Sequence, residues 1–326
     1  MNTISFHALL LIVLLNFATL NMAGQCYGSL ASTSPCISRA RPAVKSQAED
    51  TGEDLSSLRL ATPLNAAPPL VAEVSEHHDF TVELMQVGWR KGDPIDLYVI
   101  KPKHVAKPPI ILFLYGYPSE TDRFSSDEFC RLATKGGFAA VGLVEALDGH
   151  RYHDRPMRQW FVSELQEALV MSVHDIQMVL NYLSSRSDLD PNRIGMFGQG
   201  SGATIAILAA SVDNRIKAIN ALDPWGDWPE WMAKSALIPE DERLDYLTPP
   251  FLSKVARLDP VKVLPGLTQP VHLQEAIYEK GTPKACKQRL EAAMPKTGTV
   301  RRYATAREFQ DELVDGKLLN WIKDQI

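Results

Sequence analysis

A short glycine-rich segment, residues 198–202, has the residue types and spacing of a reactive turn. It reads Gly-Gln-Gly-Ser-Gly, follows the apolar run 194–197 and leads into the small residues Ala203 and Thr204. That order is typical of a buried strand that turns sharply into a helix. A serine at such a turn acts as a nucleophile when a base removes its proton, so Ser201 is the candidate nucleophile by residue type.

Two histidines in a polar segment are candidates for that base. His150 and His153 lie between Asp148 and Asp154 and follow an apolar run that ends at Ala146. Imidazole and carboxylate groups also bind metals, but this spacing matches no established metal motif. We therefore predict no metal and no cofactor, and we expect both histidines to line a pocket as part of a polar loop. A role as a catalytic base is the alternative.

The overall composition is that of an ordinary globular protein. The chain has 326 residues, of which 45% are hydrophobic and 22% are charged, enough for one large α/β domain with a short appendage. A net charge of −5 and the absence of a long basic run argue against nucleic acid as a partner. We expect a small-molecule or peptide ligand. The sequence defines neither the identity of that ligand nor the oligomeric state.

The N-terminal residues predict export. Residues 8–20 form an apolar stretch that is short for a transmembrane helix but suits the core of a signal peptide. Cleavage is expected after Ala23, or as late as Ala31, because a small residue at either position could precede a cleavage site. The protein would then be secreted or periplasmic, without membrane contact after cleavage. A retained N-terminal membrane anchor is the alternative.

The four cysteines fall into two groups. Cys26 and Cys36 lie close together near the N-terminus and are a plausible disulfide pair in an oxidising compartment. Cys130 and Cys286 lie in expected helices, where buried free thiols pack as small apolar residues. We therefore predict that the last two stay unpaired.

Residues 24–75 predict a linker, because they are rich in Ala, Ser, Thr and Pro and show no sustained hydrophobic period. The ordered domain is expected over residues 76–326. Its first two alternating segments, residues 81–89 and 94–100, predict antiparallel strands joined by a turn.

Strands and helices alternate along the rest of the chain. Residues 109–115 form a continuous apolar run, which is typical of a strand buried on both faces of a parallel sheet. Further strands are expected at 138–146, 193–199, 216–223, 270–276 and 299–304, with helices at 127–135, 159–185, 203–210 and 283–294 and a closing helix at 308–323. This alternation predicts an α/β fold whose mostly parallel, doubly wound sheet is flanked by helices.

From about residue 80 onward, roughly 250 residues resemble the α/β-hydrolase fold family, specifically its branch of dienelactone hydrolases and prolyl-oligopeptidases. The most specific part of the resemblance is residues 183–195, which are similar to the family's helix, Asp-Pro turn and elbow strand. Asp190 and Pro191 are the Asp-Pro residues of that turn. The resemblance implies the fold of serine hydrolases that cleave carboxylic esters or peptides.

In this family the elbow reads Gly-x-Ser-x-Gly. Gly198 and Gly202 match the outer glycines, but Gly200 occupies the nucleophile's position, so the turn is kept and the reactive group is lost. A shift by one residue would make Ser201 the nucleophile, yet it would place Gln199 where a small residue is required. Without the shift, the Ser201 N–H is an oxyanion donor and its hydroxyl is expected to serve the helix start.

The family's oxyanion loop follows the third strand as His-Gly-x. Here the corresponding residues are Tyr115, Gly116 and Tyr117. The resemblance implies that the backbone N–H groups of Tyr117 and Ser201 form the oxyanion hole. Pro118 has no N–H and cannot replace either donor. Tyr115 is expected to line the pocket.

The resemblance places the catalytic acid at Glu279, three residues after a small residue that closes a strand, with Pro283 matching a proline common in the family. A solvated loop glutamate is the alternative. The family's histidine position falls at Arg307 or Glu308, and no histidine follows His272. Two of the three triad positions therefore lack the catalytic residue type.

Asp223 and three tryptophans complete the expected pocket. Asp223 ends a predicted strand, where some α/β-hydrolases carry their acid, and without a histidine it would be a pocket carboxylate or a cap for the turn. Trp225, Trp228 and Trp231 recur every three residues and predict a short aromatic lid over the pocket. Packing of an insertion onto the domain is the alternative for the tryptophans.

The main hypothesis from the sequence is an exported protein of the α/β-hydrolase fold that has lost serine-hydrolase activity and binds a small molecule or peptide. The first alternative is an active serine hydrolase with a rearranged site that uses Ser201 and either His150 or His153. The second is a structural role in the cell envelope. Gly200 and the missing histidine favour the main hypothesis.

Overall fold

The computed structural model describes residues 53–326, apart from 62–63, 65–67, 91–92, 117–120 and 147–156. These residues form one unit, from Glu53 to Ile326. The predicted signal peptide and the pair Cys26 and Cys36 lie outside the described residues. Cys130 and Cys286 are buried free thiols, as predicted.

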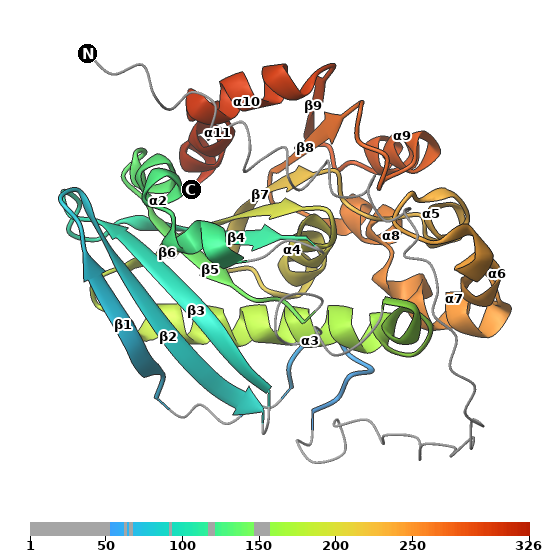
Figure 1. The fold of residues 1–326 in the computed structure, drawn as a ribbon, viewed down its shortest axis with the longest axis horizontal. Coiled ribbons are helices and arrows are strands. Elements are labelled where there is room, and N and C mark those ends of the chain that lie inside the picture. Colours follow the sequence, from blue (N-terminus) through green and yellow to red (C-terminus); the bar gives the residue numbers. More distant parts are fainter. Residues whose placement is uncertain (1–52, 62–63, 65–67, 91–92, 117–120, 147–156) are drawn as a thin grey trace, which may run out of the picture. The chain divides into compact units, whose positions relative to one another are not determined.

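A nine-stranded sheet runs through this unit in the order β1-β2-β3-β5-β4-β6-β7-β8-β9 (Figure 1). Strand β1 pairs with β2, β2 with β3 and β3 with β5 in antiparallel orientation. The other neighbouring strands pair in parallel orientation. The sheet therefore confirms the predicted mostly parallel architecture. The strands are β1 Leu70–Glu76, β2 Phe80–Arg90, β3 Asp93–Pro102, β4 Pro109–Tyr115, β5 Ala139–Leu143, β6 Asp190–Gln199, β7 Ile216–Leu222, β8 Val271–Ala276 and β9 Thr299–Tyr303.

Helices cover both faces of the sheet (Figure 1). One face carries α3 Met157–Ser185, α4 Ser201–Val212 and α9 Lys284–Ala292, and the other carries α2 Asp127–Thr134, α10 Ala306–Val314 and α11 Lys317–Gln325. Four short helices lie between β7 and β8: α5 Trp228–Lys234, α6 Arg243–Tyr246, α7 Pro249–Val255 and α8 Pro260–Val263. Within the described ranges, no helix combines the length and hydrophobicity needed to cross a bilayer.

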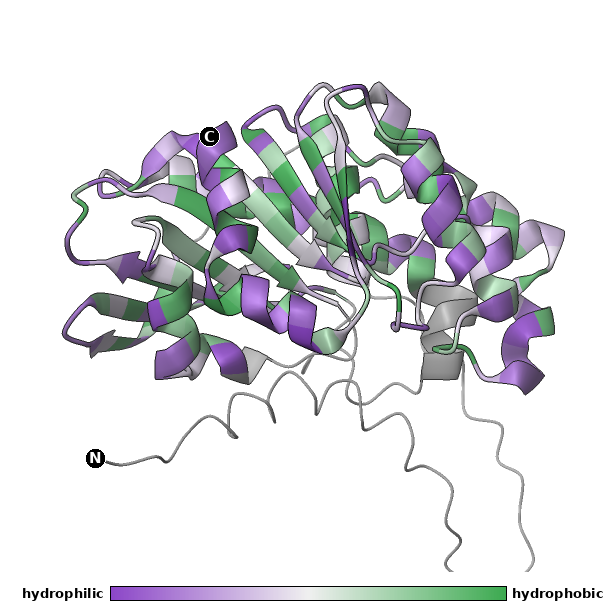
Figure 2. Cartoon of the chain, turned by 90° about the horizontal axis from the view of Figure 1, so that it is seen from above, coloured by the Kyte–Doolittle hydropathy of each residue, from purple (hydrophilic) through white to green (hydrophobic). Residues whose placement is uncertain are grey.

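The sheet separates two hydrophobic cores, and β4 shows how its sequence supplies both. Ile110, Leu112 and Leu114 are buried on the side of α3 and α4, whereas Ile111 and Phe113 are buried on the side of α2 and α11. Because successive side chains of a strand point to opposite faces, a continuous apolar run fits a sheet covered on both sides. Figure 2 shows the same distribution, with hydrophobic residues along the central strands and hydrophilic residues on the outer helices.

Part of the segment predicted as a linker belongs to the folded unit. Strand β1 pairs with β2, and residues 53–60 contact α3, so the ordered unit begins at residue 53 instead of residue 76. Strand β1 is an edge strand, exposed at all positions except Ser75. A strand without a buried face has no apolar alternation, which is why its sequence does not predict it.

The closing helix, predicted as one element over residues 308–323, consists of two helices. Gly316 adopts a φ of 73° between α10 and α11. Glycine adopts this left-handed conformation without steric cost, so it ends the first helix and lets the second start in a new direction.

Candidate active site

The turn between β6 and α4 has the backbone of a nucleophile elbow. Gly200 lies at the turn with φ 57° and ψ −121°. A Cβ on Gly198 would lie 2.5 Å from the backbone of α4, and a Cβ on Gly202 would lie 2.3 Å from the carbonyl oxygen of Leu114. Both outer glycines are thus required because the strand, the helix and β4 approach closely, as the sequence predicts.

Position 200 itself has room for a side chain. A Cβ on Gly200 would lie 3.4 Å from Trp225 Nε1 and 3.9 Å from the Cα of Gly116, and both are ordinary van der Waals distances. A Cβ at position 200 would therefore meet no close contact, although the positive φ of Gly200 is strained for a residue with a side chain.

Ser201 is turned toward the interior. Its exposed fraction is 0%, and its hydroxyl donates a hydrogen bond of 2.9 Å to Glu145 Oε1. Glu145 follows β5 and is itself 2% exposed. The sequence predicts that this hydroxyl serves the start of α4, whereas the hydrogen bond described for it goes to Glu145. Because the Ser201 side chain has no exposed surface, a substrate does not reach its hydroxyl in this conformation.

The loop after β4 lies against the elbow. A Cβ on Gly116 would lie 2.7 Å from the backbone nitrogen of Ser201 and 2.9 Å from its Oγ. This close approach is what an oxyanion loop beside the first N–H of α4 requires. Tyr117, the second expected donor, and the pocket candidates His150 and His153 lie outside the described residues.

Tyr115 packs into an aromatic cluster on the α2 side of the sheet. Its ring centroid lies 5.9 Å from that of Phe197, 6.0 Å from Phe124 and 6.2 Å from Phe129. The guanidinium of Arg123 lies 3.6 Å from the ring centroid. Burial raises the pKa of the Tyr115 hydroxyl. Tyr115 is thus partly buried among aromatic residues, and with Phe113, Phe129 and Phe197 it lines a small cavity on this side of the sheet.

Glu279, the position of the family acid, closes a turn in the loop after β8. The N–H of Thr282 donates to Oε2 at 3.0 Å, and the N–H of Gly281 donates to Oε1. Lys287 Nζ lies 3.5 Å from Oε2. Both carboxylate oxygens are therefore engaged by the backbone and a lysine, and no described histidine contributes to these contacts.

Asp223 shares the same lysine. Lys287 Nζ lies 2.8 Å from Asp223 Oδ1 and donates to the carbonyl oxygen of Ala276 at 2.6 Å. Asp223 also accepts a bond of 3.1 Å from the N–H of Ala276. Burial, opposed by Lys287 and reinforced by Glu279, raises the pKa of Asp223 to about 7. Asp223 therefore fixes the ends of β7 and β8 to each other.

The residues at the family's histidine position form local surface contacts. The Arg307 side chain is 90% exposed and lies 3.9 Å from Asp311. Glu308 accepts hydrogen bonds from the N–H of Ala304 at 2.9 Å and from Arg301 at 3.0 Å. Neither side chain can replace an imidazole, because a guanidinium stays protonated and this glutamate is already hydrogen-bonded.

The three tryptophans are buried, so the predicted lid is not confirmed. The rings of Trp225 and Trp231 stack with centroids 4.7 Å apart, and Trp228 meets Trp231 edge-on at 5.7 Å. All three belong to the core on the side of α3 and α4. Trp225 is the tryptophan that lies beside Gly200.

Two residues of this region are not evident from the sequence. Glu145 is a single carboxylate at the end of an apolar run, and its place at the carboxyl end of a strand in a parallel sheet is the signal that could have identified it. Lys287 lies in a helix with several other charged residues, and nothing in that pattern distinguishes it from a solvated lysine. Among the described residues, no group of three or more His, Cys, Asp or Glu side chains has the arrangement of a metal site.

Comparison by sequence identifies one hydrolase-like relative, and no family model matches the chain. A stretch of 164 residues, 44% of this chain, is 27% identical to the putative hydrolase YtaP of Bacillus subtilis (strain 168). The match covers 53% of that protein, so the chain spans about half the length of this curated relative.

Comparison by structure reveals similar esterases and peptidases. The acetyl xylan esterase from Paenibacillus sp. R4 has a TM-score of 0.64 and 16% identity, over 81% of this chain and 90% of that one. Acetyl xylan esterase 1 from Thermoanaerobacterium sp. JW/SL YS485 has a TM-score of 0.60 and 15% identity, over 79% and 90%. The acylaminoacyl peptidase of Pyrococcus horikoshii has a TM-score of 0.53 and 13% identity, over 80% and 50%.

At these identities the similarity shows the fold alone. Together with the sheet order and the elbow, it establishes that the chain has the α/β-hydrolase fold and resembles esterases and peptidases. The fold prediction from the sequence is confirmed.

Proposed function

We propose that this protein binds a small molecule or peptide at the elbow and does not hydrolyse it through a serine nucleophile. The observation that carries the proposal is Gly200, which has the backbone angles of an elbow nucleophile and no side chain to react. Fold and function separate here because the site, and not the fold, defines the chemistry.

The other triad positions support the same conclusion. Glu279 is held by two backbone N–H groups and by Lys287, and Arg307 and Glu308 have their own surface contacts. A serine hydrolase needs a base within hydrogen-bond reach of its nucleophile and an acid that orients the base. Two of the five described histidines, His174 and His272, hydrogen-bond to Ser57 and Thr299.

The binding role rests on what the elbow keeps. The strained turn, the close loop at Gly116 and the start of α4 are all present. In this proposal the backbone N–H of Ser201, at the start of α4, donates to a ligand oxygen. Trp225 provides an aromatic wall beside the space over Gly200. A carbonyl-containing small molecule or peptide fits these groups.

Turnover of short-chain nitrophenyl esters tests the loss of catalysis. We expect the wild type and Ser201→Ala to be equally inactive, and we expect a fluorophosphonate probe to leave folded wild-type protein unlabelled. Hydrolysis or labelling that disappears in Ser201→Ala would contradict the proposal and establish the alternative, an active hydrolase with a rearranged site.

A gain-of-function variant tests whether the elbow still has hydrolase geometry. The double change Gly200→Ser with Glu308→His restores both missing residue types, and position 200 accepts a Cβ without a close contact. We expect measurable ester hydrolysis from the double variant and none from either single variant, because the serine needs its base. No activity in a folded double variant would mean that the remaining site has drifted from catalytic geometry.

Saturation-transfer NMR with ethyl butyrate tests the binding role directly. We expect signal transfer to the ester in the wild type and its loss in Gly200→Asn, since asparagine tolerates a positive φ and places its side chain in the space over the turn. Gly266→Ala is the matched control, because a Cβ there meets nothing within 4 Å. Equal transfer in all three proteins would place ester binding elsewhere.

We also propose export of the mature domain, on the basis of the apolar residues 8–20. Mass spectrometry of the protein expressed with its full N-terminus is the test. A mature N-terminus at residue 24 or 32 is expected, and an uncleaved chain in the membrane fraction would favour the anchored alternative.

A further inference from the structure

A cavity of about 700 Å³, called here the α9 cavity, is lined by α9, by the ends of β8 and β9 and by the segment that follows α5. Helix α9 lies beside α5 at one edge of the domain (Figure 1). The described lining does not include Gly116, Gly200 or Trp225, so this space differs from the one over the elbow. Its volume falls in the range of small-molecule sites, about 300–1,000 Å³.

One wall of the α9 cavity contains a buried carboxyl group that is only half paired. Glu275 belongs to β8 and is 5% exposed. Arg302, its neighbour on β9, donates from Nε to Oε2 of Glu275 at 3.2 Å. Within the described part of the chain, Oε1 of Glu275 has no hydrogen-bond partner. A buried polar atom without a partner costs free energy of folding, so a hydrogen-bond donor in the cavity would be favourable here.

The charges around Glu275 indicate that this donor is a cation. Arg302 also pairs with Glu291 of α9, so two carboxylates share one guanidinium. Burial raises the pKa of the Glu275 carboxyl; Arg302 opposes the rise, and Glu291 adds to it. A second positive charge beside these two carboxylates would therefore stabilise their ionised forms.

The exposed side of the cavity has the opposite charge. Lys280 follows β8, Lys284 is the first residue of α9, and both are exposed. In the described ranges, neither ammonium group has an ion-pair partner. Lys234, at the end of α5, lies 2.8 Å from Glu230 of the same helix. The entrance of the cavity therefore attracts an anion, whereas its buried wall attracts a cation.

Arg243 provides a second unpaired group that points to an anion. Its Nη2 donates to the carbonyl oxygen of Ser235 at 3.2 Å. Its Nε is buried and has no hydrogen-bond partner among the residues that the structure describes. A guanidinium has donors only, so this N–H requires an oxygen acceptor. A carboxylate in the cavity would supply one.

We propose that the α9 cavity binds a free α-amino acid with an apolar side chain, as a second ligand site besides the one proposed at the elbow. The ammonium group donates to Glu275, and the carboxylate accepts from Arg243 and lies among the lysines of the entrance. The apolar side chain contacts Ile277, Ala236 and Pro283, of which Ile277 is 62% exposed. A zwitterion thus meets both charged sides of the cavity without adding net charge to it.

A small rotation brings the Glu275 carboxyl to the ligand. Its Oε1 has almost no accessible surface, but the side chain as a whole is 7% exposed and lines the cavity. The last torsion of a glutamate side chain is broad, so the carboxyl turns toward a donor at little cost while it keeps its contact with Arg302.

Isothermal titration calorimetry of the full-length wild type with L-leucine and two analogues tests the proposal. Isocaproic acid lacks the amino group of leucine, and isoamylamine lacks its carboxylate. We expect leucine to bind and each analogue to bind at least about tenfold more weakly, because each leaves one charged side of the cavity without its partner. Absence of leucine binding, or an analogue that binds as tightly as leucine, would overturn the proposal. These measurements involve no substitution, so they do not depend on the folding of a variant.

Glu275→Gln tests whether leucine binds in this cavity. We expect it to weaken leucine binding at least about tenfold, because the amide has no charge to attract the ammonium group. Glu128→Gln is the matched control: it removes the same charge from an exposed position of α2, on the other face of the sheet, and should keep the wild-type affinity. Circular dichroism verifies that both variants are folded. Equal leucine affinities of the two variants would overturn the placement of the ligand.

Lys284→Gln tests the other end of the ligand at an exposed position, where substitution leaves the fold intact. We expect weaker binding of leucine and unchanged binding of isoamylamine, which has no carboxylate to lose a partner. An equal loss for both compounds would contradict the orientation of the zwitterion.

Discussion

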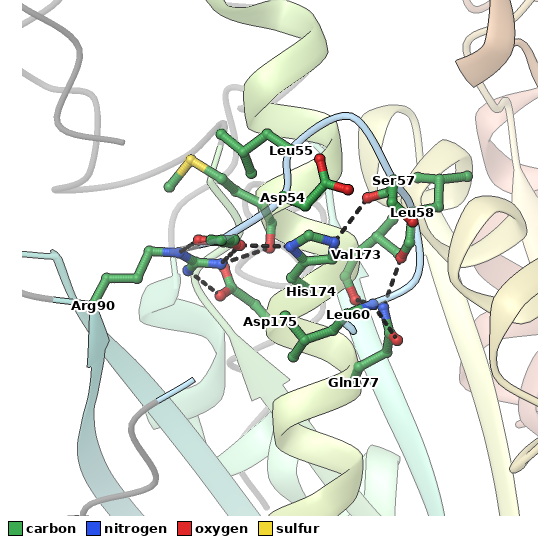
Figure 3. A network of polar contacts seen from close by, with 12 residues as sticks. Asp54, Leu55, Ser57, Leu58, Leu60, Arg90, Val173, His174, Asp175 and Gln177 are labelled. Carbon is green, nitrogen blue, oxygen red and sulfur yellow. Dashed lines mark hydrogen bonds and ion pairs between the residues drawn. The ribbon is translucent and has the colours of Figure 1, made fainter. Parts of the chain in front are cut away.

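Two regions of this protein bury carboxylates, and they treat the negative charge in opposite ways. In the network where residues 53–60 meet α3, called the strap network (Figure 3), Glu53 is hydrogen-bonded to Arg90 and His174, and its pKa falls to about 2. Beside the elbow, Asp223 and Glu279 share the single cation of Lys287, and the pKa of Asp223 rises to about 7. The ratio of cations to carboxylates, more than burial alone, determines which protonation state each region stabilises.

This difference indicates what each region is built for. A buried network whose charges are paired and hydrogen-bonded serves as a structural clamp. In the cluster beside the elbow, two carboxylates share one lysine, and their contacts join the ends of β7 and β8. Four predictions test or sharpen the comparison, from the largest expected effect to the smallest.

Arg90→Gln should cause the largest loss of stability. It leaves Glu53 and Asp175 buried without their shared cation, and breaking a buried pair in this way costs roughly 3–5 kcal/mol. Urea denaturation at pH 7 measures the loss. Arg131→Gln, which removes an exposed pair with Asp127, is the control and should cost about 0.5 kcal/mol or less. Equal effects of the two variants would mean that the strap network is not a clamp.

Lys287→Met should be costly in a pH-dependent manner. Without the lysine, Asp223 and Glu279 face each other in a buried site, so we expect a loss of about 3 kcal/mol at pH 8 and a smaller loss at pH 5, where the carboxylates take up protons. Denaturation at the two pH values measures the difference. Adding Asp223→Asn should recover part of the loss at pH 8, and a loss independent of pH would refute the shared-cation explanation.

The two regions should also oppose each other in their pH dependence. Glu53 has a lowered pKa, so its stabilisation is present above about pH 4.5 and is lost as the pH falls toward 2. Asp223 has a raised pKa, so the fold loses stability as the pH rises from about 4 through 7. Relative to wild type, Glu53→Gln should be less stable at pH 6, and the difference should shrink by about half at pH 3 and nearly disappear once the pH falls below 2.

Asp223→Asn tests the pH dependence that is opposite to that of Glu53→Gln. The stability of the wild type relative to Asp223→Asn should decline by about 2 kcal/mol between pH 4 and pH 8. Thermal denaturation across the range measures both arms. A wild-type advantage that grows with pH at Asp223 would contradict the raised pKa.

Ser201→Ala should have the smallest effect. It removes one buried hydrogen bond to Glu145 and no charge, so we expect a loss of about 1 kcal/mol. Ser211→Ala removes a half-buried bond to the carbonyl oxygen of Leu208 and is the matched control, with a smaller loss. A change in the Ser201 variant as large as that of Arg90→Gln would make Ser201 part of a larger network than its contact with Glu145.

Much of the fold follows from local patterns. The apolar run 109–115, the alternation of β2 and β3 and the glycines at 198 and 202 predict the sheet, the hairpin and the elbow, because each depends on spacing within one segment. Strand β1 and the break at Gly316 were not predicted, because an exposed edge strand has no buried period and one glycine in a helical pattern is ambiguous.

The candidate site was only partly predictable, for the same reason. The sequence identifies Gly200 at the nucleophile position and Glu279 at the acid position, since both follow from motif spacing. It does not reveal that Ser201 turns inward to Glu145, 56 residues away, or that the tryptophans are core residues. Those outcomes depend on which segments meet, and spacing along the chain carries no record of that.

What the sequence alone determined is therefore the scaffold, an α/β-hydrolase fold, together with the glycine at position 200 of the elbow motif and the lack of a histidine after His272 in the printed sequence. What only the tertiary structure decided is the pairing of charge, such as Glu53 with His174 across 121 residues and Asp223 with Lys287. Hydrophobic period and turn chemistry act between neighbours in the chain, whereas a buried ion pair exists only after folding has removed both partners from water.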